Sequence, residues 1–240
     1  MDAVGKYSVA EQVNFDGLEM YDGLRVHGAP GVHAAILKKV RQLLPPPAKV
    51  LDLACGQGAL AKRFIDAGYS MTCCDLIDDK CKIKDEAEFV QANLNEDFAG
   101  RFSELFDCVI ASEIIEHLEN PRHFLREINA LLRPGGLLLI TTPNVDSPFS
   151  KAVFLRAGYH QGFSPYDYTE SGHITPMSLS DIRRAVTESG FLLNDKSSAG
   201  GQPGSRGWWK MRALAAIISP MCDASVREQC LMVTALKSLE

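Results

Sequence analysis

The chain has 240 residues, of which 46% are hydrophobic and 23% are charged, ordinary proportions for a globular protein that exclude a disordered or fibrous one. Lysine and arginine number 25 against 30 aspartate and glutamate, so the net charge of −5 gives no overall attraction for nucleic acid. The 7 cysteines show no paired zinc-binding spacing. With no signal-peptide layout and no apolar run long enough to cross a membrane, these features predict a reduced, cytoplasmic protein.

The first half of the chain alternates short apolar runs with segments of helix length. Helices are predicted over 32–44, where three prolines follow, and over 59–67, directly after the turn Cys55-Gly56-Gln57-Gly58. The strands predicted in this half are 49–54, 69–75, 88–92 and 106–111. Strands separated by helical connections in this way form a parallel sheet.

The middle of the chain contains a capped helix, an apolar strand and a long connection. The helix is predicted from Asn120, its cap, to Leu132, with Pro121 at the first helical position. Strand 137–142 is the most apolar of the chain, which predicts burial on both faces near the centre of the sheet. Residues 145–177 are too many for an ordinary connection, and we interpret them as a lid.

The last part of the chain completes the predicted sheet. Ser178 and Asp181 form a capping box that begins a helix, and Gly190 closes it. The remaining predicted elements are a strand from 191, a helix over 208–218 and a strand over 230–236. The fold class is therefore α/β, a doubly wound and mostly parallel sheet of seven strands. The predicted organisation is a single domain over 1–240, with cap helices in 1–44, the lid in 145–177 and an insert in 201–229.

Two acidic residues accompany the glycine turn at the ends of neighbouring predicted strands. Gly56 and Gly58 carry no side chain, so a ligand can approach main-chain N–H groups at the start of the helix. The pattern Gly56-x-Gly58-x-x-Ala61 also fits a dinucleotide site. Asp52, however, would repel a pyrophosphate and attract the cationic S-adenosylmethionine, while Asp75 would accept hydrogen bonds from the ribose hydroxyls. The two acids favour the sulfonium cofactor, and a nicotinamide dinucleotide is the alternative.

An ordered series of motifs resembles the class I S-adenosylmethionine-dependent methyltransferases from about Pro46 onward. VLDLACGQGAL is similar to the first motif of that family, CCDL to the second, QANL to the third, FDCVIASEIIEHLENP to the fourth and LLRPGGLLLITTPN to the fifth. The resemblance implies a Rossmann-like sheet with a reversed last strand. It implies cofactor contacts from Asp52, Ala54, Gly56, Gly58, Asp75, Leu76, Asn93, Leu94 and Ser112. Asn93 departs from the Asp that the family often carries, so a neutral amide oxygen would meet the adenine amine.

The segment Glu113-x-x-Glu116-His117 follows the fourth predicted strand, and on a helix its polar side chains would share one face. Three interpretations are open: a divalent-metal half-site, a general-base unit, or a polar face with its own ion pairs. The pattern resembles that of ubiquinone-biosynthesis O-methyltransferases and small-RNA 2′-O-methyltransferases, which implies a divalent metal on Glu113, Glu116, His117 and His173. Without a metal, the catalytic candidates are His117 and His173, either of which could take a proton from the acceptor, together with Glu113.

Two aromatic regions are candidates for contacts with other molecules. In the lid, the side chains that could hold an acceptor are Tyr159, His160, Tyr166 and Tyr168. Segment 206–212 mixes aromatic and basic residues, which would suit a membrane surface or a polyanionic acceptor. A stripe at helical spacing favours packing for the same region and consists of Trp208, Met211, Leu214, Ala215 and Ile218.

Together these features predict a methyltransferase that uses S-adenosylmethionine and aligns an acceptor atom behind the S–CH₃ bond for in-line displacement. The expected acceptor is an oxygen of a small molecule or saccharide. The acidic balance disfavours a nucleic-acid partner, and the sequence contains no NPPY-like tetrapeptide. The alternatives are an RNA 2′-O-methyltransferase with a divalent metal and a nicotinamide-dependent oxidoreductase on the same glycine turn.

Overall fold

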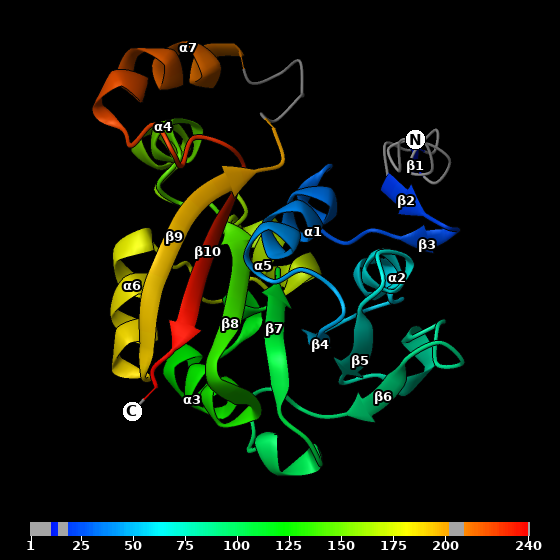
Figure 1. Ribbon diagram of the computed structural model, residues 1–240. Coiled ribbons are helices and arrows are strands. Elements are labelled where there is room, and N and C mark those ends of the chain that lie inside the picture. Colours follow the sequence, from blue (N-terminus) through cyan, green and yellow to red (C-terminus); the bar gives the residue numbers. More distant parts are fainter. Residues whose placement is uncertain (1–10, 14–18, 202–208, 240) are drawn as a thin grey trace, which may run out of the picture.

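A sheet of seven strands forms the centre of the computed structural model, which describes residues 11–13, 19–201 and 209–239 (Figure 1). The strand order is β6-β5-β4-β7-β8-β10-β9. The strands are β4 (Lys49–Leu53), β5 (Ser70–Asp75), β6 (Glu88–Gln91), β7 (Phe106–Ser112), β8 (Leu132–Pro143), β9 (Phe191–Ala199) and β10 (Cys230–Lys237). Strand β10 runs antiparallel to both of its neighbours, β8 and β9, and the other neighbouring pairs in this sheet are parallel. The predicted α/β sheet with a reversed last strand is therefore confirmed.

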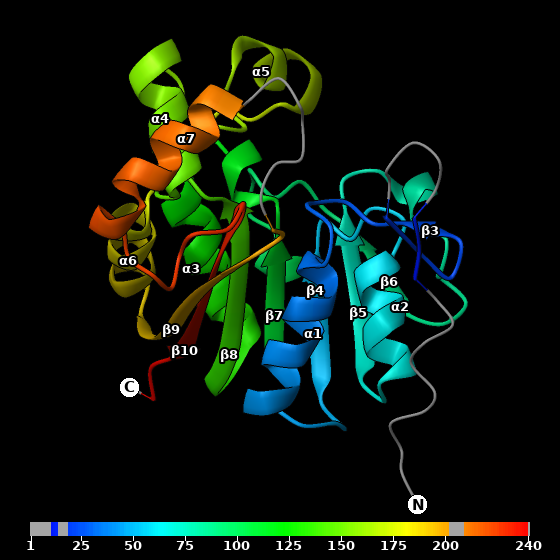
Figure 2. The same cartoon turned by 90° about the horizontal axis from the view of Figure 1, so that it is seen from above.

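Helices cover both faces of this sheet (Figure 2). The helices α1 (Val32–Leu43) and α2 (Ala59–Asp66) lie on one face, and α3 (Pro121–Leu131) and α6 (Leu179–Glu188) lie on the other. The buried apolar side chains form two large clusters that match these faces. Successive residues of a strand, such as Val50 and Leu51, belong to opposite clusters because their side chains point to opposite faces.

The helix starts and the central strand follow from local sequence signals. The Asn120 side chain accepts a hydrogen bond from the backbone N–H of His123, and Ser178 forms a capping box with Asp181, as predicted. Residues 137–142 of β8 are all buried. The strand begins earlier than predicted, however, because Leu132 already pairs with Phe106 across a register shift in β7.

The N-terminal region differs from the cap helices predicted in 1–44. Its described part contains β1 (Glu11–Val13), β2 (Glu19–Tyr21) and β3 (Leu24–Arg25), which form a small antiparallel sheet before α1. Glu19 anchors this sheet through a buried ion pair with Arg63 of α2, at 2.8 Å. The helix predicted over 32–44 is confirmed as α1, whereas these strands were not predicted, because strands this short offer too few positions for an alternating pattern to be visible.

The segment interpreted as a lid contains α4 (Pro148–Ala157) and α5 (Pro165–Ser171). Helix α7 (Trp209–Ile218), from the insert before the last strand, packs on α4 (Figure 2). The contact is made by Met211 and Ala215 of α7 and by Phe149, Ala152 and Val153 of α4. The predicted packing stripe is confirmed for its described members, and Trp208 lies outside the described residues. Within the described ranges, every helix is too short or too polar to cross a bilayer.

Candidate functional site

A cavity of about 1140 Å³ lies at the carboxyl ends of β4, β5 and β7, where ligands bind in open parallel sheets. Strand ends, the lid and the N-terminal segment all contribute to its wall. The lining residues used below are Arg25, His27, Ala54, Gly56, Asp75, Leu76, Asp79, Lys80, Ser112, Glu113, Glu116, His117, Gly162, His173 and Cys230. The volume exceeds the range of about 300–1,000 Å³ that is typical of single-ligand sites, so two reactants can lie side by side.

Asp75 is held in a fixed orientation at the end of β5. One carboxylate oxygen accepts a hydrogen bond from the N–H of Gly56 at 2.9 Å, and the other accepts from the N–H of Ile77 at 3.1 Å. Gly56 adopts a φ of +55°, and a Cβ there would lie 3.2 Å from the His27 ring. The turn therefore uses the Gly56 N–H to aim Asp75, and each carboxylate oxygen keeps a lone pair for a ligand.

Gly58 has a packing role in the structure and does not line the cavity. Its φ is +93°, and a Cβ would lie only 2.6 Å from the Ile83 side chain. Its N–H donates to the carbonyl of Cys55 at 2.9 Å, which closes the turn. At Gly58 the glycine turn is in close contact with the loop after β5, and a cofactor contact of this residue stays a prediction.

Asp52 also lies outside the cavity wall, in contrast to the prediction. Its side chain is buried, and its Oδ2 atom has no hydrogen-bond partner within the described ranges. Burial, reinforced by the negative charge of Asp75, raises the pKa of Asp52 to about 8. The carboxyl group is therefore mostly protonated at neutral pH, and the predicted attraction between an ionised Asp52 and a cationic cofactor is not supported.

The two residues predicted to meet the adenine are engaged elsewhere. The Asn93 amide oxygen accepts a hydrogen bond from the N–H of Asn95 at 3.1 Å, and its amide nitrogen donates to Glu96 at 2.8 Å. Leu94 is buried in the core, and neither residue lines the cavity. The Asn93 side chain thus forms a local turn of the Asx type, although the third motif predicted that it would meet the adenine. The predicted residues that do meet at the cavity are Ala54, Gly56, Asp75, Leu76 and Ser112.

Glu113 does not share a helical face with Glu116 and His117, as the spacing suggested. It occupies a left-handed turn with a φ of +51°, and only Ile115–His117 forms a short 3₁₀ turn. The Glu113 carboxylate accepts a hydrogen bond from the Cys230 thiol at 3.5 Å, and its Oε1 atom has no partner among the described residues. Burial raises the pKa of Glu113. The chain turns here because β7 ends and the backbone N–H of Glu113 donates to Thr141 of β8.

Glu116, His117 and His173 converge at the lid end of the cavity. Their donor atoms lie within 4.8 Å of one another, and the two imidazole rings are 4.7 Å apart in an edge-to-face arrangement. The buried Glu116 carboxylate accepts a hydrogen bond from Thr142 at 3.0 Å, and its Oε1 atom is unpartnered within the described ranges. Burial raises the pKa of Glu116 well above its usual range. Three of the four predicted metal ligands therefore meet, and Glu113 is not in this group.

The two histidines can accept a proton or bind a metal ion. The Nδ1 atom of His173 lies 2.6 Å from the carbonyl oxygen of Gly162, and because a carbonyl only accepts, Nδ1 carries the hydrogen. In the neutral ring, the Nε2 atom of His173 then keeps a lone pair. Burial, followed by the proximity of His173, lowers the pKa of His117, so its imidazole is neutral at pH 7.

Sequence reasoning missed one group of lining residues and placed another wrongly. Arg25 and Lys80 line the cavity from segments with no motif. Of the aromatic lid residues expected to hold an acceptor, Tyr166 and Tyr168 are exposed, and His160 stacks on Phe154. Helix α5 begins with a capping box between Ser164 and Asp167, and its Tyr166 and Tyr168 side chains face solvent. The positions of the two basic residues and of the lid aromatic residues depend on tertiary structure and have no signal in the sequence.

Comparison with known proteins identifies the family. A family model described as "Methyltransferase domain" matches residues 27–194. A ubiquinone biosynthesis O-methyltransferase from Parvibaculum lavamentivorans is 24% identical over 67% of this chain and 65% of its own length. One from Xanthomonas axonopodis pv. citri is 33% identical over 47% of this chain and 50% of its own length. The chain thus spans about half to two thirds of these relatives.

A solved structure supports the fold. The crystal structure of a SAM-dependent methyltransferase from Archaeoglobus fulgidus superposes with a TM-score of 0.56 at 18% identity, covering 85% of this chain and 94% of the other. Identity at this level shows a shared fold alone. Since the family model covers more than half of the chain and the sheet has the family's reversed last strand, this protein belongs to the class I S-adenosylmethionine-dependent methyltransferases.

Proposed function

We propose that this chain transfers the methyl group of S-adenosylmethionine to a hydroxyl oxygen of a small-molecule acceptor. The observation that carries the proposal is one continuous cavity with Asp75 at one end and the His117–His173 pair at the other. Family membership supports the cofactor, and the relatives that are named O-methyltransferases support an oxygen acceptor. The class of the acceptor, a small molecule or a saccharide, is itself part of the proposal.

The residues at the β5 end of the cavity suit a nucleoside. Asp75 presents carboxylate lone pairs toward the cavity, which can accept hydrogen bonds from both ribose hydroxyls. Arg25 and Lys80 supply positive charge on the same wall, which suits the carboxylate of the methionyl part. When bound, S-adenosylmethionine supplies an electrophilic methyl group. The chain's contribution is alignment, which can lower a barrier by about 7–11 kcal/mol.

The residues at the lid end suit removal of the acceptor proton. A neutral His117 or the free Nε2 lone pair of His173 can take the hydroxyl proton as the oxygen forms its new bond to carbon. Burial raises the pKa values of Glu113 and Glu116, which favours the uncharged form of each side chain. An uncharged surrounding is favourable, because a strongly anionic site would stabilise the sulfonium before its charge is lost in the transition state.

A second candidate assigns a divalent metal ion to Glu116, His117 and His173. One carboxylate and two imidazoles within 4.8 Å of one another form a donor set that suits such an ion, and the Glu116 Oε1 atom has no other partner in the part of the chain that is described. An ion there would hold the acceptor oxygen and favour its deprotonated form. With a metal ion at this position, RNA methylated at a 2′-oxygen remains the alternative acceptor.

Transfer of a labelled methyl group tests the proposal. The purified chain is incubated with methyl-labelled S-adenosylmethionine and, in separate reactions, with a dihydroxybenzene, a monosaccharide and total RNA. Labelled dihydroxybenzene or sugar supports the proposal, and labelling of RNA alone would replace it with the RNA activity. Metal analysis of unchelated protein, with activity before and after EDTA, separates the two versions of the lid end. An activity that survives EDTA in metal-free protein assigns proton removal to the histidines.

A further inference from the structure

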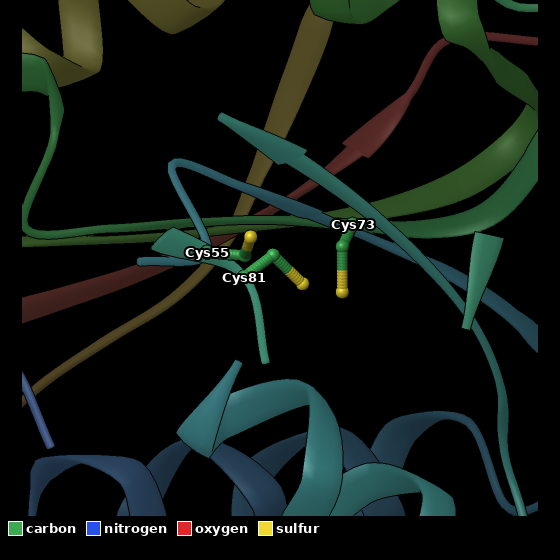
Figure 3. Close-up of side chains that lie close together, drawn as sticks. All are labelled: Cys55, Cys73 and Cys81. Atoms are coloured by element: carbon green, nitrogen blue, oxygen red, sulfur yellow. The ribbon is translucent and has the colours of Figure 1, made fainter. Parts of the chain in front are cut away.

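Three cysteine thiols form a buried cluster beside the candidate site, and the proposed methyl transfer does not use it. Cys55 lies in the glycine turn after β4, Cys73 lies in β5, and Cys81 follows the short 3₁₀ helix η1 (Asp78–Lys80) (Figure 3). All three are free thiols with exposures of 8%, 0% and 5%. The adjacent Cys74 belongs to the apolar cluster on the opposite face of the sheet. Three separate segments of the chain thus place their sulfur atoms close together.

The geometry of the cluster suits a trigonal metal ion. The three Sγ atoms lie within 4.8 Å of one another, and Figure 3 shows the Cys81 thiol directed toward Cys73. The Cys55 thiol also donates a weak hydrogen bond to the carbonyl oxygen of Gly56, at 3.7 Å. Bonds of about 2.3 Å from a metal ion to three thiolates would place the sulfur atoms about 4.0 Å apart. Since the sulfur atoms all lie within 4.8 Å of one another, a small adjustment of the side chains is enough to reach this spacing.

The donor chemistry selects a soft metal ion. Among the described residues this group contains sulfur donors only, with no carboxylate or imidazole inside the same 4.8 Å. Thiolates prefer soft ions to Mg²⁺ or Ca²⁺. A disulfide would require an S–S distance of about 2.05 Å and would leave the third thiol without a role. Three converging sulfur atoms are therefore explained better by coordination than by a redox pair.

We propose that Cys55, Cys73 and Cys81 bind one soft divalent metal ion through three thiolates. Binding releases three thiol protons to solvent and leaves a complex with a net charge of −1. The ion would tie the loop that carries Cys81 to the glycine turn. That contact already exists, because the N–H of Lys82 donates to the carbonyl of Gln57 at 3.2 Å and Ile83 packs against Gly58. The ion strengthens it and stabilises the folded chain.

Titration with Cd²⁺ tests this site on the reduced, metal-free chain of 240 residues. The site predicts ultraviolet charge-transfer absorption that saturates at one equivalent, together with a higher melting temperature. The Cys73→Ala variant should bind Cd²⁺ about 100-fold more weakly or not at all, because one of three ligands is lost. The matched control is Cys74→Ala, which removes a buried thiol from the same strand on the opposite face and should leave the affinity unchanged.

A second measurement requires no variant. X-ray absorption at the cadmium edge of the unmutated chain, loaded with one equivalent, should show a coordination shell of three sulfur atoms. A shell dominated by oxygen or nitrogen, an absent absorption band, or equal losses in Cys73→Ala and Cys74→Ala would overturn the proposal. A disulfide within the cluster in protein purified without reductant would do the same. Neither readout involves methyl transfer, so both are independent of the proposed function.

Discussion

The two ends of the cavity are built in different ways. Most of the end near Asp75 comes from one continuous stretch, in which β4, the glycine turn and β5 are held together by hydrogen bonds of backbone N–H groups, and Arg25 joins it from the N-terminal segment. The end near His117 combines a left-handed turn after β7, the end of β8 and a lid segment distant in sequence. Local sequence therefore carries the information for the first end, whereas the second depends on tertiary contacts. The difference implies that variants at the two ends should alter different steps.

The largest effect is expected from His117→Ala. Loss of the imidazole should reduce kcat about 100- to 10,000-fold, the usual contribution of a positioned acid or base, and leave the affinity for S-adenosylhomocysteine unchanged. Steady-state kinetics and calorimetry measure the two quantities. His160→Ala is the matched control, because His160 stacks on Phe154 and does not line the cavity. Equal losses of kcat in both variants, or a loss of affinity for S-adenosylhomocysteine in His117→Ala alone, would contradict the separation into a catalytic end and a cofactor-binding end.

The next largest effect is expected at the opposite end, from Asp75→Ala. Loss of two charge-assisted hydrogen bonds, each contributing about 1.5–3 kcal/mol, should weaken S-adenosylhomocysteine binding about 100-fold or more. Calorimetry measures this affinity directly. Asp79→Ala serves as the control because Asp79 also lines the cavity but is exposed. An Asp75→Ala chain that binds the nucleoside as tightly as the Asp79→Ala chain would show that the ribose does not lie on Asp75.

A smaller effect concerns folding, because Gly58 is proposed to act through packing. Gly58→Ala should lower the free energy of unfolding by about 2 kcal/mol more than Gly158→Ala, since its added Cβ meets Ile83 at 2.6 Å. Gly158 has a similar positive φ but no atom within 4 Å of the added Cβ, so backbone strain cancels in the comparison. Urea unfolding of both variants gives the difference. Equal losses of unfolding free energy in the two variants would mean that the loop after β5 moves to accommodate the added Cβ without destabilising the fold.

The smallest effect, taken per pH unit, is the pH dependence of stability that Asp52 causes. Its pKa rises from 3.8 to about 8 on folding, so between these values the folded chain binds more protons than the unfolded chain, and stability falls as pH rises. The slope for one proton is about 1.4 kcal/mol per pH unit. Asp52→Asn should remove this contribution when unfolding is measured from pH 5 to 7. If the free energy of unfolding of the variant depends on pH as steeply as that of the unmutated chain, a group other than Asp52 causes the dependence.

Much of the fold could be predicted from the sequence, because strands, caps and the glycine turn depend on residues close together in the chain. Asn120, Ser178 and the apolar strand 137–142 act through such local signals. The two-residue strand β3, which brings Arg25 to the cavity, has no comparable signal.

The candidate site was predictable only in part. Ala54, Gly56, Asp75, Leu76 and Ser112 lie at the cavity because they follow parallel strands that end at one edge. The burial of Asp52 and the turn at Asn93 could not be read from motif order, because both depend on neighbours in space. Helical spacing misplaced Glu113 for a related reason, since the chain turns there to pair with Thr141.

Calorimetric titration of the folded, unmutated chain with S-adenosylhomocysteine, and separately with NAD, tests the central claim most directly. The account predicts saturable binding of one S-adenosylhomocysteine per chain and no comparable heat with NAD. Binding of NAD alone, or no binding of S-adenosylhomocysteine by protein shown to be folded, would contradict the assignment of the cavity to the methyl donor.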